Sequence, residues 1–107
     1  MPEARHVTGK DLDEELARKE CCVVEFWMHG CPACARFAST FSALALELQE
    51  RANVCAIEAR QNIEVCKKHG IEAVPTVVVF KSGEEVQRTT GSKTLEEMRE
   101  WLEPALV

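Results

Sequence analysis

Apolar residues along this chain follow two spacings, which predict helices and strands in alternation. Four segments repeat apolar positions every three or four residues, as expected for helices with one buried face. The clearest of them has Phe37, Phe41, Leu44 and Leu48 on one such face. Four shorter segments are runs of β-branched and other apolar residues, which are typical of buried strands. The predicted helices cover residues 8–19, 32–51, 63–69 and 94–103, and the predicted strands cover residues 22–28, 53–59, 76–81 and 85–89.

The residues between these segments and the order of the segments predict an α/β architecture. Gly70 fits a left-handed cap on the third helix, Ser82 and Gly83 form a hairpin signal, and Pro104 is expected to end the last helix. The strand–helix–strand segments predict parallel, right-handed crossovers, and the late hairpin adds an antiparallel edge. We therefore expect an α/β sandwich around a mixed sheet, with one domain over residues 1–107.

Charge and composition narrow the range of functions. The chain has 13 Lys and Arg against 18 Asp and Glu, a net charge of −5, and no basic cluster. This balance argues against nucleic acid and anionic membranes as partners. No apolar run approaches the roughly 20 residues of a membrane span, and residues 1–19 lack the apolar core of a signal peptide. We expect a cytoplasmic monomer, in a compartment where thiols are kept reduced.

Two of the six cysteines form the strongest chemical signal in the sequence. Cys31 and Cys34 are separated by two residues at the junction of a predicted buried strand and a long helix, so their sulfurs can bridge within one turn. Unpaired N–H groups and the dipole at a helix N-terminus favour a thiolate at Cys31, and thiolate is the form that attacks disulfides. Cys34, one turn further along, is expected to be more covered and to resolve a mixed disulfide. Pro32 removes a backbone donor beside Cys31.

Several motifs, in order and at matching spacing, resemble the thioredoxin family. They are residues 24–27 (VEFW), 31–34 (CPAC) and 70–76 (GIEAVPT), and the resemblance continues through residues 80–84, Gly91 and the last helix. It implies the thioredoxin fold, a central mixed β-sheet flanked by helices on both faces, with the dithiol exposed at a helix tip.

The resemblance also implies roles for residues around the dithiol. Pro75 matches the family's cis-proline, so that the backbone at Val74 pairs with an extended substrate peptide, and Gly91 lines the same groove. Trp27 matches a tryptophan near the dithiol; packing in the core is the other interpretation of this residue. With Gly30 and Pro32 next to Cys31, these residues make up the predicted substrate-binding set.

Glu25 interrupts an otherwise apolar strand six residues before Cys31. The family has aspartate at this position, and the resemblance implies that this carboxyl accepts the proton of the resolving cysteine. A buried carboxyl has a raised pKa, which suits proton exchange near neutrality. The alternative is a strand glutamate that reaches solvent.

The sequence departs from the family pattern at several positions. Gly30 replaces a tryptophan before the first cysteine, Pro32 and Ala33 replace Gly-Pro, Ala56 replaces a lysine near the carboxyl, and Ser39 replaces a helix-kinking proline. Proline directly after the first cysteine is more similar to glutaredoxins. These departures bear on the redox potential, the substrates and the choice of reductase.

We therefore predict a thiol–disulfide oxidoreductase in which Cys31 attacks a protein disulfide, Cys34 resolves the mixed disulfide and Glu25 assists proton transfer. No metal or organic cofactor is expected, and the electron donor is a thioredoxin-reductase-like partner linked to NADPH. Two alternatives keep the fold, namely a glutaredoxin-like protein that draws on glutathione and a binding or scaffold module with an incidental dithiol.

The other cysteines admit a third alternative, a zinc site. Cys66 and His69 form a second pair after Cys31 and Cys34, but the 31 intervening residues exceed the spacing of compact zinc modules. We expect Cys22, Cys55 and Cys66 to pack in the core, with a regulatory or dimerising role as the other interpretation of Cys66. Cys21 is expected to be exposed.

Overall fold

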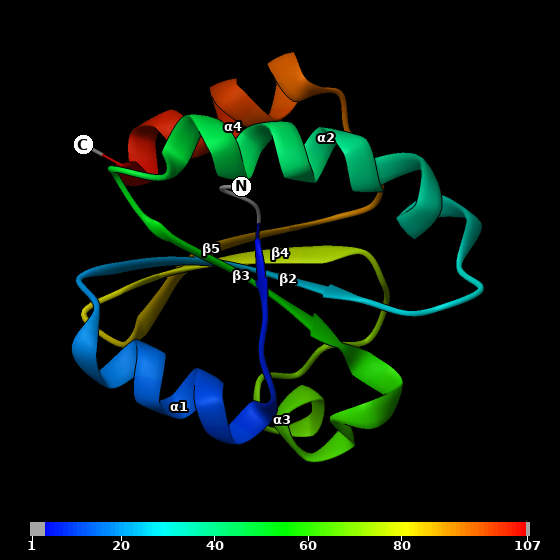
Figure 1. Cartoon of the computed structure of the whole chain (residues 1–107), viewed down its shortest axis with the longest axis vertical. Coiled ribbons are helices and arrows are strands. Elements are labelled where there is room, and N and C mark those ends of the chain that lie inside the picture. Colours follow the sequence, from blue (N-terminus) through cyan, green and yellow to red (C-terminus); the bar gives the residue numbers. More distant parts are fainter. Residues whose placement is uncertain (1–3, 107) are drawn as a thin grey trace.

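The computed structural model describes residues 4–106 and has a central sheet of five strands (Figure 1). The strands follow the order β1-β3-β2-β4-β5, so the apolar strand that leads to the dithiol occupies the centre. The strands are β1 (Arg5–His6), β2 (Cys21–Trp27), β3 (Asn53–Glu58), β4 (Thr76–Lys81) and β5 (Glu84–Thr90).

The strand directions make this a mixed sheet. β3 runs parallel to β2, as the first strand–helix–strand segment predicts, and β1 runs parallel to β3. β5 is the antiparallel edge predicted from the hairpin signal. The second predicted parallel crossover is wrong, because β4 returns antiparallel to β2. The helix between β3 and β4 is short, and the chain returns through it and a loop along β2 in the opposite direction.

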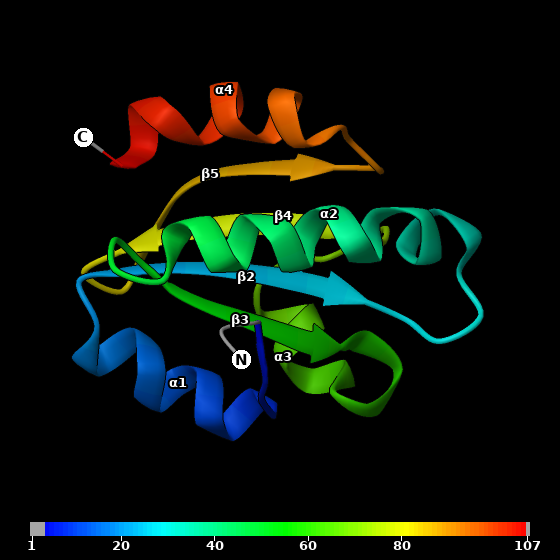
Figure 2. The same ribbon diagram turned by 45° about the horizontal axis from the view of Figure 1, so that its top comes forward.

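Helices cover both faces of the sheet, as Figure 2 shows from a second angle. On one face α2 and α4 contribute to a core that contains Phe37, Leu44 and Met98, and on the other α1 and α3 contribute to a core that contains Leu12 and Ile57. A 3-10 turn, η1 (Ala59–Gln61), precedes α3. The helices are α1 (Gly9–Arg18), α2 (Pro32–Leu48), α3 (Ile63–Lys68) and α4 (Leu95–Leu106).

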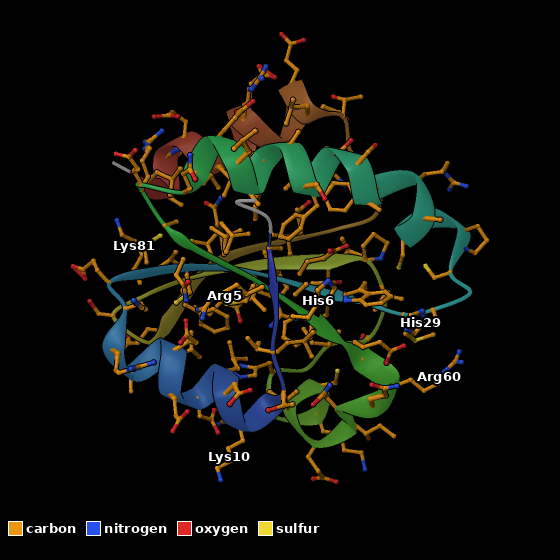
Figure 3. The ribbon with its side chains drawn as sticks, in the orientation of Figure 1. Arg5, His6, Lys10, His29, Arg60 and Lys81 are labelled. Carbon is orange, nitrogen blue, oxygen red and sulfur yellow. The ribbon has the colours of Figure 1, made fainter. Side chains whose placement is uncertain are left out.

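Two details of the chain differ from the sequence prediction. Pro104 lies inside α4 and does not end it, because Ala105 is buried in the core and Leu106 packs against it, which favours a further half-turn of helix. β1 was not predicted; its two residues are exposed and carry no apolar alternation. The side chains of Arg5 and His6 point to opposite sides of β1, so Arg5 reaches Glu15 on α1 while His6 turns toward Trp27 (Figure 3).

Alternation along β2 decides which side chains meet the dithiol helix. Successive residues of a strand point to opposite faces. Val23 lies in the core under α2 and α4, whereas Val24 and Phe26 lie in the core over α1 and α3. Glu25 shares the face of Val23, and the strand therefore directs its carboxyl toward α2.

Candidate functional site

Cys31 and Cys34 lie at the start of α2, directly after the loop that follows β2. Cys31 is the N-cap of the helix, and Pro32 occupies a first-turn position where no N–H is needed. The Cys31 Sγ accepts a hydrogen bond from the Cys34 backbone N–H at 3.1 Å. Gly30 precedes them with φ of +79°, a left-handed conformation that favours glycine. The turn therefore presents the Cys31 sulfur where helix N–H groups stabilise negative charge.

The two thiols differ in exposure and in proton affinity. Cys31 is partly exposed, whereas Cys34 is buried with 5% of its surface accessible. Burial, and after it the hydrogen bond with the Cys31 side chain, raise the pKa of the Cys34 thiol to about 11. Cys34 therefore keeps its proton at neutral pH while Cys31 faces solvent.

The loop before β4 lies against the exposed thiol. The Val74–Pro75 peptide bond is cis, as the family resemblance implied. The Cys31 thiol lies 3.8 Å from the Val74 carbonyl oxygen, and the Gly91 N–H donates to the Pro75 carbonyl at 2.8 Å. Residues that are far apart in the sequence thus form one surface around Cys31.

Glu25 is buried beneath the dithiol, with 6% of its surface accessible, so it is not a solvent-facing strand glutamate. Burial raises the pKa of its carboxyl to about 7. Its neighbours across the sheet are Ala56 on β3 and Val77 on β4, neither of which carries a charge. Glu25 and Cys34 are close enough for the negative charge of the carboxylate to contribute to the raised pKa of Cys34.

Glu58, at the end of β3, fixes the loop that leads into the dithiol. Its carboxylate accepts the His29 N–H at 3.1 Å and the Gln61 N–H at 2.9 Å. Burial alone would raise the pKa of Glu58, but these and other N–H donors outweigh burial and lower it. The sequence analysis missed this residue, although an acidic residue at the end of an apolar strand was a signal that could have found it.

We expect Glu58→Ala to destabilise the fold by about 1–3 kcal/mol at pH 7, because the His29 and Gln61 backbone N–H groups lose their acceptor. Urea unfolding of the variant and the wild type measures this change. Glu64→Ala, at an exposed position on α3, is the matched control and should change the free energy of unfolding by less than about 0.5 kcal/mol. Equal effects of the two substitutions would contradict the role of Glu58.

Aromatic rings gather on the side of the loop that faces β1. The Trp27 ring makes edge contacts with His6 at 5.6 Å and with His29 at 4.6 Å between ring centroids. The Trp27 Nε1–H is buried and has no hydrogen-bond partner within residues 4–106. Trp27 is thus part of the wall next to the dithiol rather than of the central core.

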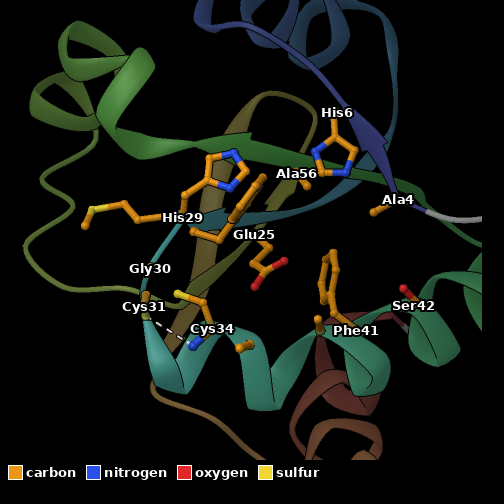
Figure 4. Close-up of a pocket in the computed structure, with 14 residues that line it drawn as sticks. Ala4, His6, Glu25, His29, Gly30, Cys31, Cys34, Phe41, Ser42 and Ala56 are labelled. Atoms are coloured by element: carbon orange, nitrogen blue, oxygen red, sulfur yellow. Dashed lines mark hydrogen bonds between the residues drawn. The ribbon is translucent and has the colours of Figure 1, made fainter.

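Two hollows adjoin the dithiol. The first is a pocket of about 300 Å³ behind Cys34, bounded by β1, β3 and α2, with Glu25 directed into it (Figure 4). The second is an apolar groove of about 440 Å³ on the Val74 side, and its lining includes Met28 and Ile63. Ile63 is 54% exposed, which leaves an apolar surface open to a partner.

The remaining cysteines lie away from this site. Cys22, Cys55 and Cys66 are buried, as predicted, but Cys21 is buried as well. The prediction that Cys21 is exposed is wrong because β2 begins at Cys21, and the side chain points into the core under α2.

The zinc alternative finds no support in the arrangement of donor side chains. The His69 ring packs against Phe26 and Phe80, and the Cys66 thiol lies 3.8 Å from the Ala59 carbonyl oxygen. Across residues 4–106 there is no group of three or more His, Cys, Asp or Glu side chains that could hold a metal ion.

The sheet order, the helix layers and a dithiol at the tip of α2 define a thioredoxin-fold protein. A family model described as Thioredoxin matches residues 3–104, so the chain belongs to the thioredoxin family. This membership is consistent with thiol–disulfide oxidoreductase chemistry. In the described part of the chain, no helix is long and apolar enough to cross a membrane.

Two known proteins illustrate the similarity. A thioredoxin of Rickettsia bellii (strain RML369-C) is 29% identical over 100 residues, which cover 92% of this chain and 95% of that protein. The solved structure of a mutant thioredoxin from Halobacterium salinarum NRC-1 has a TM-score of 0.88. It is 24% identical, and the match covers 99% of this chain and 93% of that one.

Proposed function

We propose that this protein reduces disulfide bonds in other proteins through the Cys31–Cys34 dithiol. The observation that carries the proposal is the asymmetry of the pair, with Cys31 partly exposed at a helix N-terminus and Cys34 buried one turn behind it. The exposed sulfur is accessible to a large substrate. The covered sulfur is screened from a large substrate and lies one turn from Cys31, which suits a resolving role.

The reaction transfers two electrons in two exchanges. In the first, the Cys31 thiolate attacks one sulfur of the substrate disulfide, forms a mixed disulfide and releases the other substrate sulfur as a thiolate. In the second, the Cys34 thiol gives up its proton and its thiolate attacks the Cys31 sulfur. The products are the Cys31–Cys34 disulfide and a reduced substrate, whose thiolates take up protons.

Glu25 is the proposed acceptor of the Cys34 proton. A carboxyl with a pKa of about 7 is partly ionised at neutral pH, so it can accept a proton and return it later. Its position on the face of β2 under α2 supports this role. The side chain is one methylene longer than the family's aspartate, which brings the carboxyl further toward α2.

The substrate is an extended peptide segment that lies across the loop at Val74 and Pro75. Trp27, Gly30, Pro32 and Gly91 complete the proposed contact surface. The contact of Cys31 with the Val74 carbonyl oxygen supports this assignment, because a substrate cysteine that bonds to Cys31 must lie beside that loop. The apolar groove next to Val74 offers room for a neighbouring apolar side chain.

A reductase linked to NADPH is the proposed electron donor, and no metal or organic cofactor takes part. Glutathione is the second candidate donor, and Pro32 directly after Cys31 is the residue that favours it. Rates of reduction of the oxidised protein by glutathione and by a thioredoxin reductase separate the two donors.

Trapping the mixed disulfide tests the mechanism. Cys34→Ser is expected to accumulate a covalent adduct with a disulfide substrate such as native insulin, because the resolving thiol is absent. Intact mass and peptide mapping should place the adduct on Cys31. The matched variant Cys31→Ser should form no adduct under the same conditions; an adduct on Cys34 or on another cysteine would contradict the assignment.

A further inference from the structure

The pocket behind the dithiol is a hollow with one acidic group and apolar walls. It has a volume of about 300 Å³, at the lower end of the range for small-molecule sites. Figure 4 shows the carboxyl of Glu25 in the middle of this space, between Cys34, Phe41 and His6. The lining includes the aromatic side chains of His6, Trp27 and Phe41, and it contains no lysine or arginine.

The carboxyl in this pocket has no partner within the protein. Glu25 is more than nine-tenths buried, and its carboxyl opens only to the pocket; among residues 4–106 no side chain or backbone N–H donates to it and no cation pairs with it. Burial is the sole cause of its raised pKa, so no nearby positive charge offsets the cost of ionising it. A buried carboxylate without a partner is unfavourable, and a cation that fits beside it gains that interaction.

Small side chains create the space in which such a cation would sit. Ala56 is the residue directly across from Glu25 on β3, and its side chain in the pocket wall is a single methyl group. Ala35 and Ala38 border the pocket from α2. The hollow therefore opens toward β1 and β3. Glu25 is the one carboxyl group in its wall, and the other titratable groups there are histidines and thiols.

We propose that this pocket binds a small primary ammonium compound, with the ammonium group on the Glu25 carboxylate and a short apolar body against Phe41 and Trp27. Aromatic faces stabilise cations, and the apolar walls take up the body of the ligand. A pocket of this volume suits a ligand on the order of ten non-hydrogen atoms.

The titratable groups around Glu25 set the pH dependence of binding. Cys31 and Cys34 face it from α2, His6 from β1 and His29 from the loop after β2. Glu25 is ionised at pH 8 and almost wholly protonated at pH 5.5. This protonation weakens the binding of a cation at pH 5.5 by about 30-fold.

Occupancy of the pocket would also regulate the dithiol, a consequence that rests on the proposed function. A bound ammonium favours the carboxylate form of Glu25 and the thiolate form of Cys34, since both carry negative charge. The binding itself does not depend on redox activity, and it is tested separately.

The test is a titration of the whole, reduced protein with 2-phenylethylamine at pH 8, followed by ¹⁵N–¹H NMR shifts. Its matched probe is 2-phenylethanol, which has the same shape without the charge. We expect saturable binding of the amine with a dissociation constant on the order of 1 mM, as suits about nine non-hydrogen atoms. The alcohol should bind at least tenfold more weakly, and the amine should bind about 30-fold more weakly at pH 5.5.

Two variants locate the site. Glu25→Gln, which keeps the shape and removes the charge, should weaken amine binding at least tenfold, and Ala56→Met, which fills the pocket, should abolish it. Absence of saturable amine binding, equal binding of the alcohol, or full binding to both variants would overturn the proposal. The comparison of the two probes on the wild type decides the matter even if a variant does not fold. Insulin reduction by the same protein is measured in parallel. Intact insulin reduction without amine binding means that this inference fails while the proposed function holds, and loss of insulin reduction means that the proposed function fails.

Discussion

Cys31→Ser is expected to lower the rate of insulin disulfide reduction by about three orders of magnitude or more. Cys31 is the one cysteine of the described residues that is not buried, and serine replaces its thiol with a hydroxyl, which is a far weaker nucleophile at neutral pH. The Cys34 thiol cannot substitute for it, because that side chain is buried and holds its proton with a pKa of about 11. The turbidity of precipitating insulin chains in the presence of dithiothreitol measures the rate.

The matched control is Cys21→Ser, at the opposite end of β2 and outside the dithiol surface. This variant should retain wild-type activity. Residual activity of Cys31→Ser within tenfold of the wild type would contradict the assignment of Cys31 as the nucleophile.

Glu25→Gln is expected to increase the free energy of unfolding relative to the wild type by a larger amount at pH 8 than at pH 5. In the wild type the folded-state pKa of Glu25 is about 7, above the value of about 4.3 in an unfolded chain. The protonated carboxyl therefore contributes its full stability below about pH 4, and this stability is lost as the pH rises through 7. Glutamine cannot ionise, so the variant avoids this loss.

Urea unfolding at the two pH values measures the effect. The difference in free energy of unfolding between variant and wild type should be larger at pH 8 than at pH 5 by about 2–3 kcal/mol. Glu100→Gln, at an exposed position on α4, controls for the general effect of removing a carboxyl. An equal difference at both pH values would show that Glu25 is not a buried carboxyl with a raised pKa.

The instability of an ionised Glu25 and its proposed part in proton transfer are linked. An ionised Glu25 is unfavourable for the folded state at neutral pH, and no neighbouring cation relieves it. Such a cost in stability is common where a group is positioned for proton transfer. The stability measured with Glu25→Gln and the proton transfer proposed for Glu25 therefore have the same physical origin.

The sequence predicted the parts of the fold that depend on strong periodicity. The face of α2 with Phe37, Phe41, Leu44 and Leu48 is buried as the spacing required. The continuous apolar run of β2 lies at the centre of the sheet, where both faces are covered. Both features follow from local patterns of apolar residues, and the side chains that carry such a pattern are the ones that become buried.

The errors concern features that tertiary packing decides. The direction of β4 depends on how the chain returns after α3, which no local pattern encodes. β1 is a two-residue edge strand whose pairing with β3 comes from the sheet and not from its own side chains. Pro104 remains helical because residues after it are packed against the core.

The candidate site was predicted in part for a similar reason. Cys31, Cys34 and Glu25 stand out in the sequence because two are a spaced pair and one is a charge in an apolar strand. An acidic residue at the end of an apolar strand was a signal for Glu58. Its partner in the loop after β2 and the pocket beside Ala56 could not be derived from the sequence, because they depend on contacts between β3 and that loop. Whether a carboxylate has a partner is a property of the folded chain.

A redox titration of the Cys31–Cys34 couple tests the central claim most directly. The protein is equilibrated with mixtures of reduced and oxidised glutathione, alkylated, and analysed by mass spectrometry of the peptide that contains both cysteines. The account predicts one reversible two-electron transition, in which the ratio of oxidised to reduced protein changes tenfold for about every 30 mV. The oxidised product is the Cys31–Cys34 disulfide. A dithiol that stays fully alkylated at every ratio, or a disulfide between other cysteines, would contradict it.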